Sequence, residues 1–412
     1  MRSRKNHEAA EAVGLKSSAV GRGRLFPTCV GKLPVAGGLS CCPRRRTLGV
    51  RAPQPRISIP RFLSPARFAI ALTLIGLSMT AQPVRAQPLA FTGTNLSGGE
   101  FGNVQPGKAP VYGKDFTYPN EGELAYFAAK GMNVIRLPFH WEVLQPTPKT
   151  PLVPAEEQRI KDVVMAATKK NLVVLLDPHN YARYYGKVIG GPDVSDADFA
   201  DFWGRLAADF KGNSHVWFGL MNEPHDMPTP QWFDAANAAV AAIRKAGAKN
   251  LILVPGNGWS GAHSWLDSGN AILLKIADPA HHYAFEAHQY LDSDNSGTHA
   301  EAVSATVGSE RLRVFTDWCR ENHQRAFLGE FGVGANDTGK QAISDMLTLM
   351  EKNRDVWIGY TWWSAGPWWG NYMFSIEPDK GVDRPQMSWL LPHLHRAPKA
   401  AGRRAVAARV SR

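Results

Sequence analysis

The sequence predicts a single (β/α)8 barrel, in which eight parallel strands alternate with helices. Eight short apolar runs alternate with amphipathic stretches from Pro88 onwards, which is the order of elements in a parallel α/β fold. The alternating region is about 310 residues long, a length that suits a closed barrel with loop insertions. Polar residues follow the apolar runs, as they do at the strand ends that form the functional face of a barrel. No second module interrupts this region, so we expect one domain over residues 87–395.

The expected strands and helices follow one another along the chain. The strands are expected at 88–95, 132–138, 172–177, 216–221, 251–255, 283–287, 326–329 and 356–361. The helices are expected at 121–130, 154–170, 196–211, 230–246, 271–276, 310–322 and 339–353. The strands are too short and apolar for helices, whereas the segments between them have the apolar period of a helix with one buried face.

The N-terminal segment is expected to direct export rather than to fold with the barrel. An uncharged, mostly apolar run of 14 residues, 68–81, follows Arg61 and Arg67 and precedes Val84-Arg85-Ala86, a small-x-small cleavage pattern. The run is too short to span a bilayer comfortably. We therefore expect residues 1–86 to be an N-terminal extension and secretory signal peptide that is cleaved near Ala86. The protein would then be secreted, with no membrane anchor.

The net charge of the whole chain, +11, arises mainly from the same segment. Residues 1–86 hold 15 of the 47 Lys and Arg residues and only 2 of the 36 Asp and Glu residues, so residues 87–412 carry a net charge of −2. The positive charge is therefore no argument for a nucleic-acid partner, and none is expected. Residues 396–412 contain six Lys and Arg residues, and we expect a basic, disordered tail there.

The cysteines predict a domain without disulfides. Cys29, Cys41 and Cys42 precede the expected cleavage site, so Cys319 alone would remain in the mature chain. Cys319 lies in an amphipathic stretch, and we expect a structural thiol that faces the core rather than a nucleophile.

Two glutamates directly follow apolar runs that we interpret as strands four and seven. Glu223 lies in the segment LMNEPH at 220–225, and Glu330 in FLGEFG at 327–332. Strands four and seven are three apart in an eight-strand ring, so the two carboxyl groups are expected to face one another at one end of the barrel. Hydrolysis of a glycosidic bond requires such a pair, in which one carboxyl group donates a proton and the other stays ionised.

Polar and aromatic residues also follow the other strands. They are Arg136, His179, Asn180, Asn222, Asn257, Trp259, His288, Tyr290, Trp362 and Trp363. Each one alone has an ordinary structural explanation, such as an ion pair or core packing. Together with Glu330, they place polar or aromatic residues at the ends of seven strands of one barrel, which favours an active site at that end.

Six segments resemble glycoside hydrolase family 5, and most closely its β-1,4-endoglucanases of the type shared by fungi and bacteria. They are NVIRLPF at 133–139, DPHNYAR at 177–183, WFGLMNEPHD at 217–226, HQYLDSD at 288–294, GEF at 329–331 and WWSAGPWW at 362–369. The resemblance extends from about Asn95 to Pro392. The segment with Asn-Glu-Pro is moderately specific alone, and the occurrence of all six in this order makes the resemblance specific.

The resemblance implies a retaining endo-β-1,4-glucanase that acts by double displacement. Glu223 would be the acid/base and Glu330 the nucleophile, with their carboxyl groups roughly 5–5.5 Å apart. Arg136 and Tyr290 would hold the nucleophile by charge and hydrogen bond, which favours its ionised form.

The resemblance also implies roles for residues around this pair. Asn222 would bind the sugar 2-hydroxyl, while His179 and His288 would border the subsite of cleavage. Trp363 would lie under the sugar that is attacked. Trp141, Tyr184, Trp259, Trp265, Trp368 and Trp369 lie in loops expected at the same end; of these, Trp259 is our candidate for a second sugar contact.

Other classes of protein fit the sequence less well. His281, His282 and His288 lack the ligand spacing of a zinc enzyme, and no Gly-rich phosphate loop follows strands seven or eight. We expect no metal and no cofactor, and a monomer whose partner is a β-glucan polysaccharide. Two alternatives remain: a related two-glutamate barrel hydrolase acting on mixed-linkage β-glucan, xyloglucan or β-mannan, and an inactive carbohydrate-binding barrel.

Overall fold

The computed structural model describes residues 87–395. The expected signal peptide and N-terminal extension in 1–86 and the expected tail in 396–412 lie outside the described residues. Within 87–395, no helix is long and apolar enough to cross a membrane.

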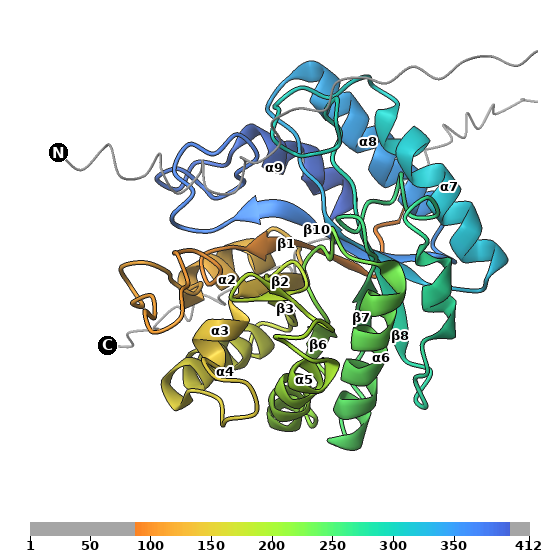
Figure 1. The fold of residues 1–412 in the computed structure, drawn as a ribbon. Helices are drawn as coiled ribbons and strands as arrows, with labels where there is room; N and C mark the ends of the chain where they lie inside the picture. The colour runs from red at the N-terminus through yellow and green to blue at the C-terminus, as the bar shows by residue number, and fades with distance from the viewer. Residues whose placement is uncertain (1–86, 396–412) are drawn as a thin grey trace, which may run out of the picture. The chain divides into compact units, whose positions relative to one another are not determined.

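Eight parallel strands form a closed barrel, as the sequence predicts (Figure 1). They are β1 (Phe91–Leu96), β2 (Val134–Phe139), β3 (Val173–Pro178), β6 (Val216–Gly219), β7 (Ile252–Pro255), β8 (Tyr283–His288), β9 (Ala326–Glu330) and β10 (Trp357–Ala365). Around the barrel the order is β1, β10, β9, β8, β7, β6, β3 and β2, and β1 closes the ring by pairing with β2. Every expected strand is present. β6 is shorter than expected, and β10 extends to Ala365.

The helices surround the barrel in Figure 1. The expected ones are α2 (Glu121–Ala129), α4 (Pro154–Thr168), α5 (Asp196–Phe210), α6 (Thr229–Lys245), α7 (Val307–Glu321), α8 (Asp337–Lys352) and the 3-10 helix η1 (Asn270–Lys275). Two of them, α2 and α5, begin with a capping box, in which two side chains accept hydrogen bonds from each other's backbone N–H groups. The pairs are Asn120 with Glu123 in α2 and Ser195 with Asp198 in α5.

The elements that the sequence did not predict are all short. They are α3 (Trp141–Leu144), the hairpin of β4 (Arg183–Tyr184) and β5 (Lys187–Val188), α9 (Pro385–Leu390) and the 3-10 helix η2 (Leu391–His393). The two hairpin strands have two residues each, and α3 and η2 have at most four, so these segments hold about one strand or helix period and show no repeat.

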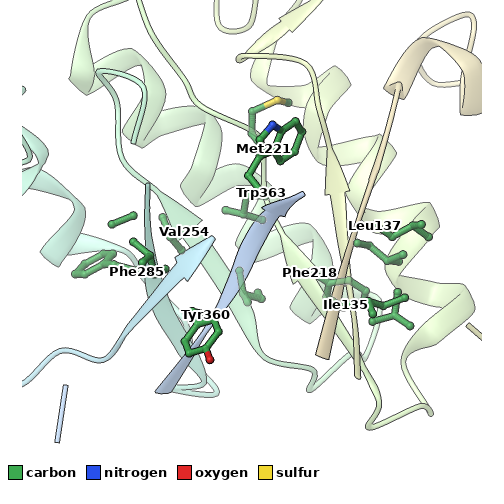
Figure 2. Close-up of a cluster of buried hydrophobic side chains, with 14 of the residues drawn as sticks. Ile135, Leu137, Phe218, Met221, Val254, Phe285, Tyr360 and Trp363 are labelled. Atoms are coloured by element: carbon green, nitrogen blue, oxygen red, sulfur yellow. The ribbon is translucent and has the colours of Figure 1, made fainter. Parts of the chain in front are cut away.

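The main hydrophobic core fills the space between the barrel and its helices. Figure 2 shows part of it, with residues from several strands: Ile135, Leu137, Phe218, Val254, Phe285 and Tyr360. Cys319 in α7 is a fully buried free thiol in this core, which confirms the expected structural position. Burial also raises the thiol's pKa, which disfavours a nucleophilic thiolate.

A second apolar cluster occupies the barrel interior and includes Val134, Leu175, Trp217, Ala284 and Phe327. Successive side chains of a strand point to opposite faces. The residues two positions after Val134, Leu175 and Ala284 therefore point into the interior as well, one layer nearer the C-terminal strand ends. These residues are Arg136, Asp177 and Glu286, and all three are fully buried. The interior thus changes from an apolar layer to a charged layer as it approaches the C-terminal end.

The pairing of β8 with β9 contains an irregularity at this end. Ala287 pairs with Leu328, but His288 pairs with Glu330, so Gly329 is an extra residue in β9. Bulges of this kind redirect side chains and occur often beside active sites. Here the bulge places His288 directly beside Glu330.

Candidate active site

The two glutamates predicted from the sequence meet at the C-terminal end of the barrel. Glu330 is the last residue of β9, and Glu223 follows β6, three strands away around the ring. A carboxylate oxygen of each, together with a ring nitrogen of His288, lies within 4.8 Å of the others. Glu330 is 3% exposed, whereas the Glu223 side chain is 13% exposed. Both carboxyl groups can therefore reach one substrate atom placed between them.

Each oxygen of Glu330 accepts a hydrogen bond from a different residue. Arg136 Nη1, from β2, donates to Oε1 at 2.8 Å. The hydroxyl of Tyr290, which follows β8, donates to Oε2 at 2.7 Å. Tyr290 is buried, and burial together with the negative charge of Glu330 raises its pKa well above the ordinary value. The tyrosine is therefore a neutral donor at ordinary pH, and the carboxyl group of Glu330 is held from two sides.

Arg136 is fully buried and serves several acceptors besides Glu330. Nη1 also donates to Asn95 Oδ1 at 3.0 Å, and Nη2 donates to Asn222 Oδ1 at 2.9 Å. Asp177 Oδ2 lies 3.1 Å from Nη1, and Glu286 Oε1 lies 3.0 Å from Nε. Burial alone would lower the pKa of Arg136, but the surrounding carboxylates raise it above its ordinary value. The guanidinium is therefore permanently charged, and its plane sets the directions of the hydrogen bonds that it donates in the site.

His288 lies between the two glutamates and a third carboxylate. Nδ1 lies 2.7 Å from Glu223 Oε1 and 3.7 Å from Glu330 Oε2, while Nε2 lies 3.4 Å from Glu286 Oε1. Burial would lower the pKa of His288, but these three carboxylates outweigh it and raise the pKa to about 10. The imidazole is therefore positively charged at neutral pH, with an N–H directed toward Glu223.

His179, in contrast to His288, is neutral. Its Nδ1 lies 2.8 Å from Asp177 Oδ2, and its Nε2 lies 3.1 Å from Asn222 Nδ2. Burial lowers the pKa of His179 well below its ordinary value. A neutral ring with its proton on Nδ1 satisfies both contacts, because Nε2 then accepts from the amide of Asn222. The neutral ring also stacks on Trp363, with centroids 5.4 Å apart and planes at 16°.

The two candidate sugar contacts differ in exposure. Trp363 is 6% exposed, whereas Trp259 in the loop after β7 is 49% exposed. Trp259 stacks on His225 with centroids 3.5 Å apart and planes at 7°, and its backbone N–H donates to Pro224 O at 3.0 Å. The loop that carries Trp259 is thereby fixed to the residues that directly follow Glu223.

Residues with positive φ are concentrated around these side chains. Glu223 has φ of 40°, Tyr181 of 56° and Trp259 of 60°. Such left-handed backbone costs of the order of 1–3 kcal/mol at a non-glycine residue and is found preferentially at functional sites. The sequence showed no sign of this strain.

Most of the other aromatic residues expected in loops at this end are packing residues. Trp141 begins α3 and donates Nε1–H to Gln145 Oε1, the Tyr184 hydroxyl donates to Gln145 O, and the Trp265 ring packs 4.7 Å from Phe315. All three are buried and contribute to packing, and Trp259 remains the candidate for the second sugar contact. Trp141 belongs to α3 and Tyr184 to β4, two of the short elements that the sequence did not predict. Trp368 is 38% exposed, and the ring of Trp369 lies edge-on to Trp363.

Three buried polar residues of the network were not singled out in the sequence. Asn95 is the last but one residue of β1, Asp177 is the last but one residue of β3, and Glu286 lies inside β8. Asp177 and Glu286 interrupt otherwise apolar runs, and charged residues are almost never fully buried unless they are paired. A charged residue within a buried strand is therefore a signal that could have marked Asp177 and Glu286 as members of a site.

Two groups of residues within 87–395 have ligand atoms close enough for a cation. One is Glu223, His288 and Glu330 in the site itself. The other is Asp292, Asp294 and His299 in the loop after β8. In that loop, Asp292 Oδ2 already accepts the backbone N–H groups of Thr298 and His299, so its carboxylate organises the loop.

Comparisons with known proteins agree with this geometry. The family model for cellulase, glycosyl hydrolase family 5, matches residues 85–366. A protein of Neosartorya fischeri named "Probable endo-beta-1,4-glucanase B" is 43% identical over 310 residues, 74% of this chain and 92% of that protein.

Two solved structures are also similar. The endo-beta-1,4-glucanase Xac0029 from Xanthomonas axonopodis pv. citri is 50% identical, with a TM-score of 0.72 over 75% of this chain and 99% of that one. XacCel5A in complex with cellopentaose is 49% identical, with a TM-score of 0.72 over 74% of this chain and 99% of that one.

Proposed function

Because this chain belongs to glycosyl hydrolase family 5, the cellulase family, we propose that it is an endo-β-1,4-glucanase that retains configuration by double displacement. The observation that carries the proposal is the pair of carboxylates at the C-terminal end of the barrel. Glu223 and Glu330 have oxygens within 4.8 Å of each other. This spacing suits direct attack by one carboxylate, because an inverting pair stands roughly 6.5–9.5 Å apart to admit a water.

In the first half of the reaction, Glu330 attacks the anomeric carbon. A bond forms between Glu330 and that carbon as the glycosidic C–O bond breaks, and the leaving oxygen takes a proton from Glu223. Arg136 and Tyr290 keep the carboxylate of Glu330 oriented toward the carbon with their two hydrogen bonds. Such fixed donors lower the barrier, because they need no rearrangement during the reaction.

In the second half, water releases the sugar. Glu223, now ionised, removes a proton from water, and the oxygen of that water displaces Glu330 from the anomeric carbon. Two inversions restore the original β configuration. His288 can stabilise the negative charge that Glu223 carries between the two halves, because its Nδ1 lies 2.7 Å from Glu223 Oε1.

The proposed sugar contacts surround this pair. Asn222 Nδ2 carries two N–H groups. One donates a hydrogen bond to His179 Nε2, so the other can donate to a sugar 2-hydroxyl. Trp363, supported by the parallel ring of His179, would stack under the sugar that is attacked. Trp259 lies beside the residues that follow the acid/base, so it would stack on a sugar of the leaving chain.

A substrate panel separates this proposal from its alternatives. We expect the highest rates on carboxymethylcellulose, barley β-glucan and lichenan, which contain β-1,4-glucosidic bonds, and low rates on mannan and xylan. Dominant activity on mannan or xyloglucan would replace the glucanase assignment by the related hydrolase. No activity on any polysaccharide would favour a carbohydrate-binding barrel.

The stereochemistry of the product tests the mechanism itself. Proton NMR of a fresh hydrolysate should show the β-anomer first, followed by slow mutarotation. An initial α signal would mean that water attacks directly, and the double displacement would be refuted.

We also propose that the enzyme is secreted as a monomer whose catalytic domain is 87–395. The support is the signal-like pattern that ends near Ala86. Mass analysis of exported protein should place the N-terminus near Gln87, and a chain that starts there should retain full activity. An insoluble or inactive 87–412 chain would show that residues 1–86 belong to the fold.

A further inference from the structure

Glu286 is a buried carboxylate to which the mechanism above assigns no role. It lies on β8 two residues before His288, so both side chains point into the barrel. Glu286 is fully buried. A lone carboxylate in such a place would be very costly, so its partners must compensate.

Two glycines make room for the Glu286 carboxylate. A Cβ at Gly329, the extra residue of the β9 bulge, would lie 2.2 Å from Glu286 Oε1 and 2.7 Å from His288 Nε2. A Cβ at Gly219, which ends β6, would lie 3.3 Å from Glu286 Oε2. The bulge that places His288 beside Glu330 therefore also opens the space that Glu286 fills.

Glu286 contacts two residues, one of which contacts Glu330 and the other Glu223. Its Oε1 lies 3.0 Å from Arg136 Nε as an ion pair without hydrogen-bond alignment, and Arg136 Nη1 donates to Glu330. The same Oε1 lies 3.4 Å from His288 Nε2, and His288 Nδ1 lies 2.7 Å from Glu223. Because the guanidinium and the imidazole are rigid planes, restraining one edge of each directs the opposite edge.

We propose that Glu286 is a positioning residue that holds Arg136 and His288 together and thereby sets the relative placement of Glu330 and Glu223. The proposal rests on the proposed function, since it assigns a purpose to Glu286 in that reaction. In this arrangement, the N–H of His288 Nδ1 stays directed at Glu223 Oε1 through both halves of the reaction. The proton that Glu223 gives to the glycosidic oxygen, and later takes from water, is then carried on its other oxygen.

The charges around His288 are consistent with this role. It faces Glu286 on its own strand, Glu330 on β9 and Glu223 after β6, while Asp177 and His179 on the β3 side act from further away. Arg136 on β2 contacts the same Glu286 oxygen as His288 does. The negative charge of Glu286 thus helps His288 to keep its proton. Burial would raise the pKa of Glu286, but Arg136 and His288 lower it, so Glu286 is ionised at neutral pH.

Glu286→Gln in the full chain removes the charge while keeping the shape, and Glu351→Gln is a matched control. Glu351 is also buried and also faces a histidine, with Oε1 3.0 Å from His393 Nδ1, but it lies on α8 outside the site. In Glu286→Gln we expect kcat on cellopentaose to fall roughly 10–100-fold with KM within about twofold, the range typical of residues that orient a catalytic group. The alkaline limb of the kcat/KM profile should move to lower pH, because His288 loses its proton at lower pH without the negative charge of Glu286. Glu351→Gln should change neither quantity.

A second readout does not depend on catalysis. In ¹⁵N-histidine-labelled protein, the His288 resonance, identified by its loss in His288→Gln, should titrate at lower pH in Glu286→Gln than in the wild type. An unchanged titration together with a wild-type pH profile would overturn the proposal, and so would an equal loss of kcat in Glu351→Gln. If the wild type hydrolysed no β-glucan, the proposed function would fail while the titration still tested the link between Glu286 and His288.

Glu286→Asp keeps the test decisive if the glutamine variant does not fold. It retains the charge but withdraws the carboxylate by one methylene, so the titration of His288 should stay closer to wild type while kcat still falls. Wild-type kcat in Glu286→Asp would show that the position of this carboxylate does not matter, and would overturn the proposal.

Discussion

At Glu330, two donors on different strands hold one carboxylate, and this predicts how a conservative change will behave. Glu330→Gln removes the nucleophile but retains shape, because its amide oxygen can still accept from Arg136 and its amide N–H can donate to the hydroxyl oxygen of Tyr290. We expect turnover to become undetectable on cellopentaose, while circular dichroism and the thermal midpoint stay close to wild type. Activity near the wild-type level would end the nucleophile assignment.

Glu223→Gln should show a loss that depends on the leaving group. General acid–base help is worth roughly 10²–10⁴-fold, so we expect a loss of that order on cellopentaose. The loss should be much smaller on an aryl cellobioside with an acidic phenol, because that leaving group needs little protonation. Equal losses on both substrates would contradict the acid/base role.

Trp259 should contribute to binding of the leaving chain rather than to bond cleavage. Its ring is 49% exposed and pre-oriented by the stack on His225. Trp259→Ala should raise KM for cellopentaose by roughly fivefold, about 1 kcal/mol, with little change in KM for an aryl cellobioside. Leu266→Ala is a control in the same loop, since Leu266 is 40% exposed but has no aromatic face. Equal effects of the two variants would deny Trp259 a sugar contact.

At the scale of elements, the bulge in β9 is the feature on which the site depends. Gly329→Ala would place a Cβ 2.2 Å from Glu286 Oε1, so the strand or the carboxylate must shift. We expect a loss of about 1–3 kcal/mol in the free energy of unfolding, together with a lower kcat. Gly212→Ala, where an added Cβ meets open space, should stay within about 0.5 kcal/mol. Urea unfolding of both variants measures the difference, and wild-type stability in Gly329→Ala would show that the bulge tolerates a side chain.

At the scale of the whole molecule, two groups with raised pKa predict weaker stability at alkaline pH. Burial raises the pKa of Glu100 to about 8, and carboxylates raise that of His288 to about 10 against the opposing effect of burial. The folded protein therefore keeps protons that the unfolded chain has released. The contribution of His288 is complete below about pH 6.5 and is lost as pH rises to about 10, while that of Glu100 is lost between about pH 4.5 and 8.

Thermal unfolding measured between pH 6.5 and 10 should show a falling midpoint. Glu100→Gln should flatten the part of this decline below pH 8 and leave the part above it. A midpoint that rises with pH over this range would contradict the charge states assigned to both groups.

The order of strands and helices was determined by the sequence alone, because apolar periodicity is a local property. It identified all eight strands and the main helices, and it placed Glu223, Glu330, Arg136, His288 and Tyr290 at strand ends that a closed barrel must bring together. Short elements such as α3 and the hairpin of β4 and β5 could not be seen in this way, because they lack a full period.

Only the tertiary structure decided the contacts that depend on register and depth. Whether an aromatic residue such as Trp141 or Trp259 is buried or exposed depends on which distant segments cover it. The link from Glu286 to Glu330 and Glu223 depends on one extra residue in β9 and on the rigid planes of Arg136 and His288. Apart from the contact of Glu286 with His288 two residues later, these links join residues 65 to 194 positions apart in the chain, so no local pattern in the sequence records them.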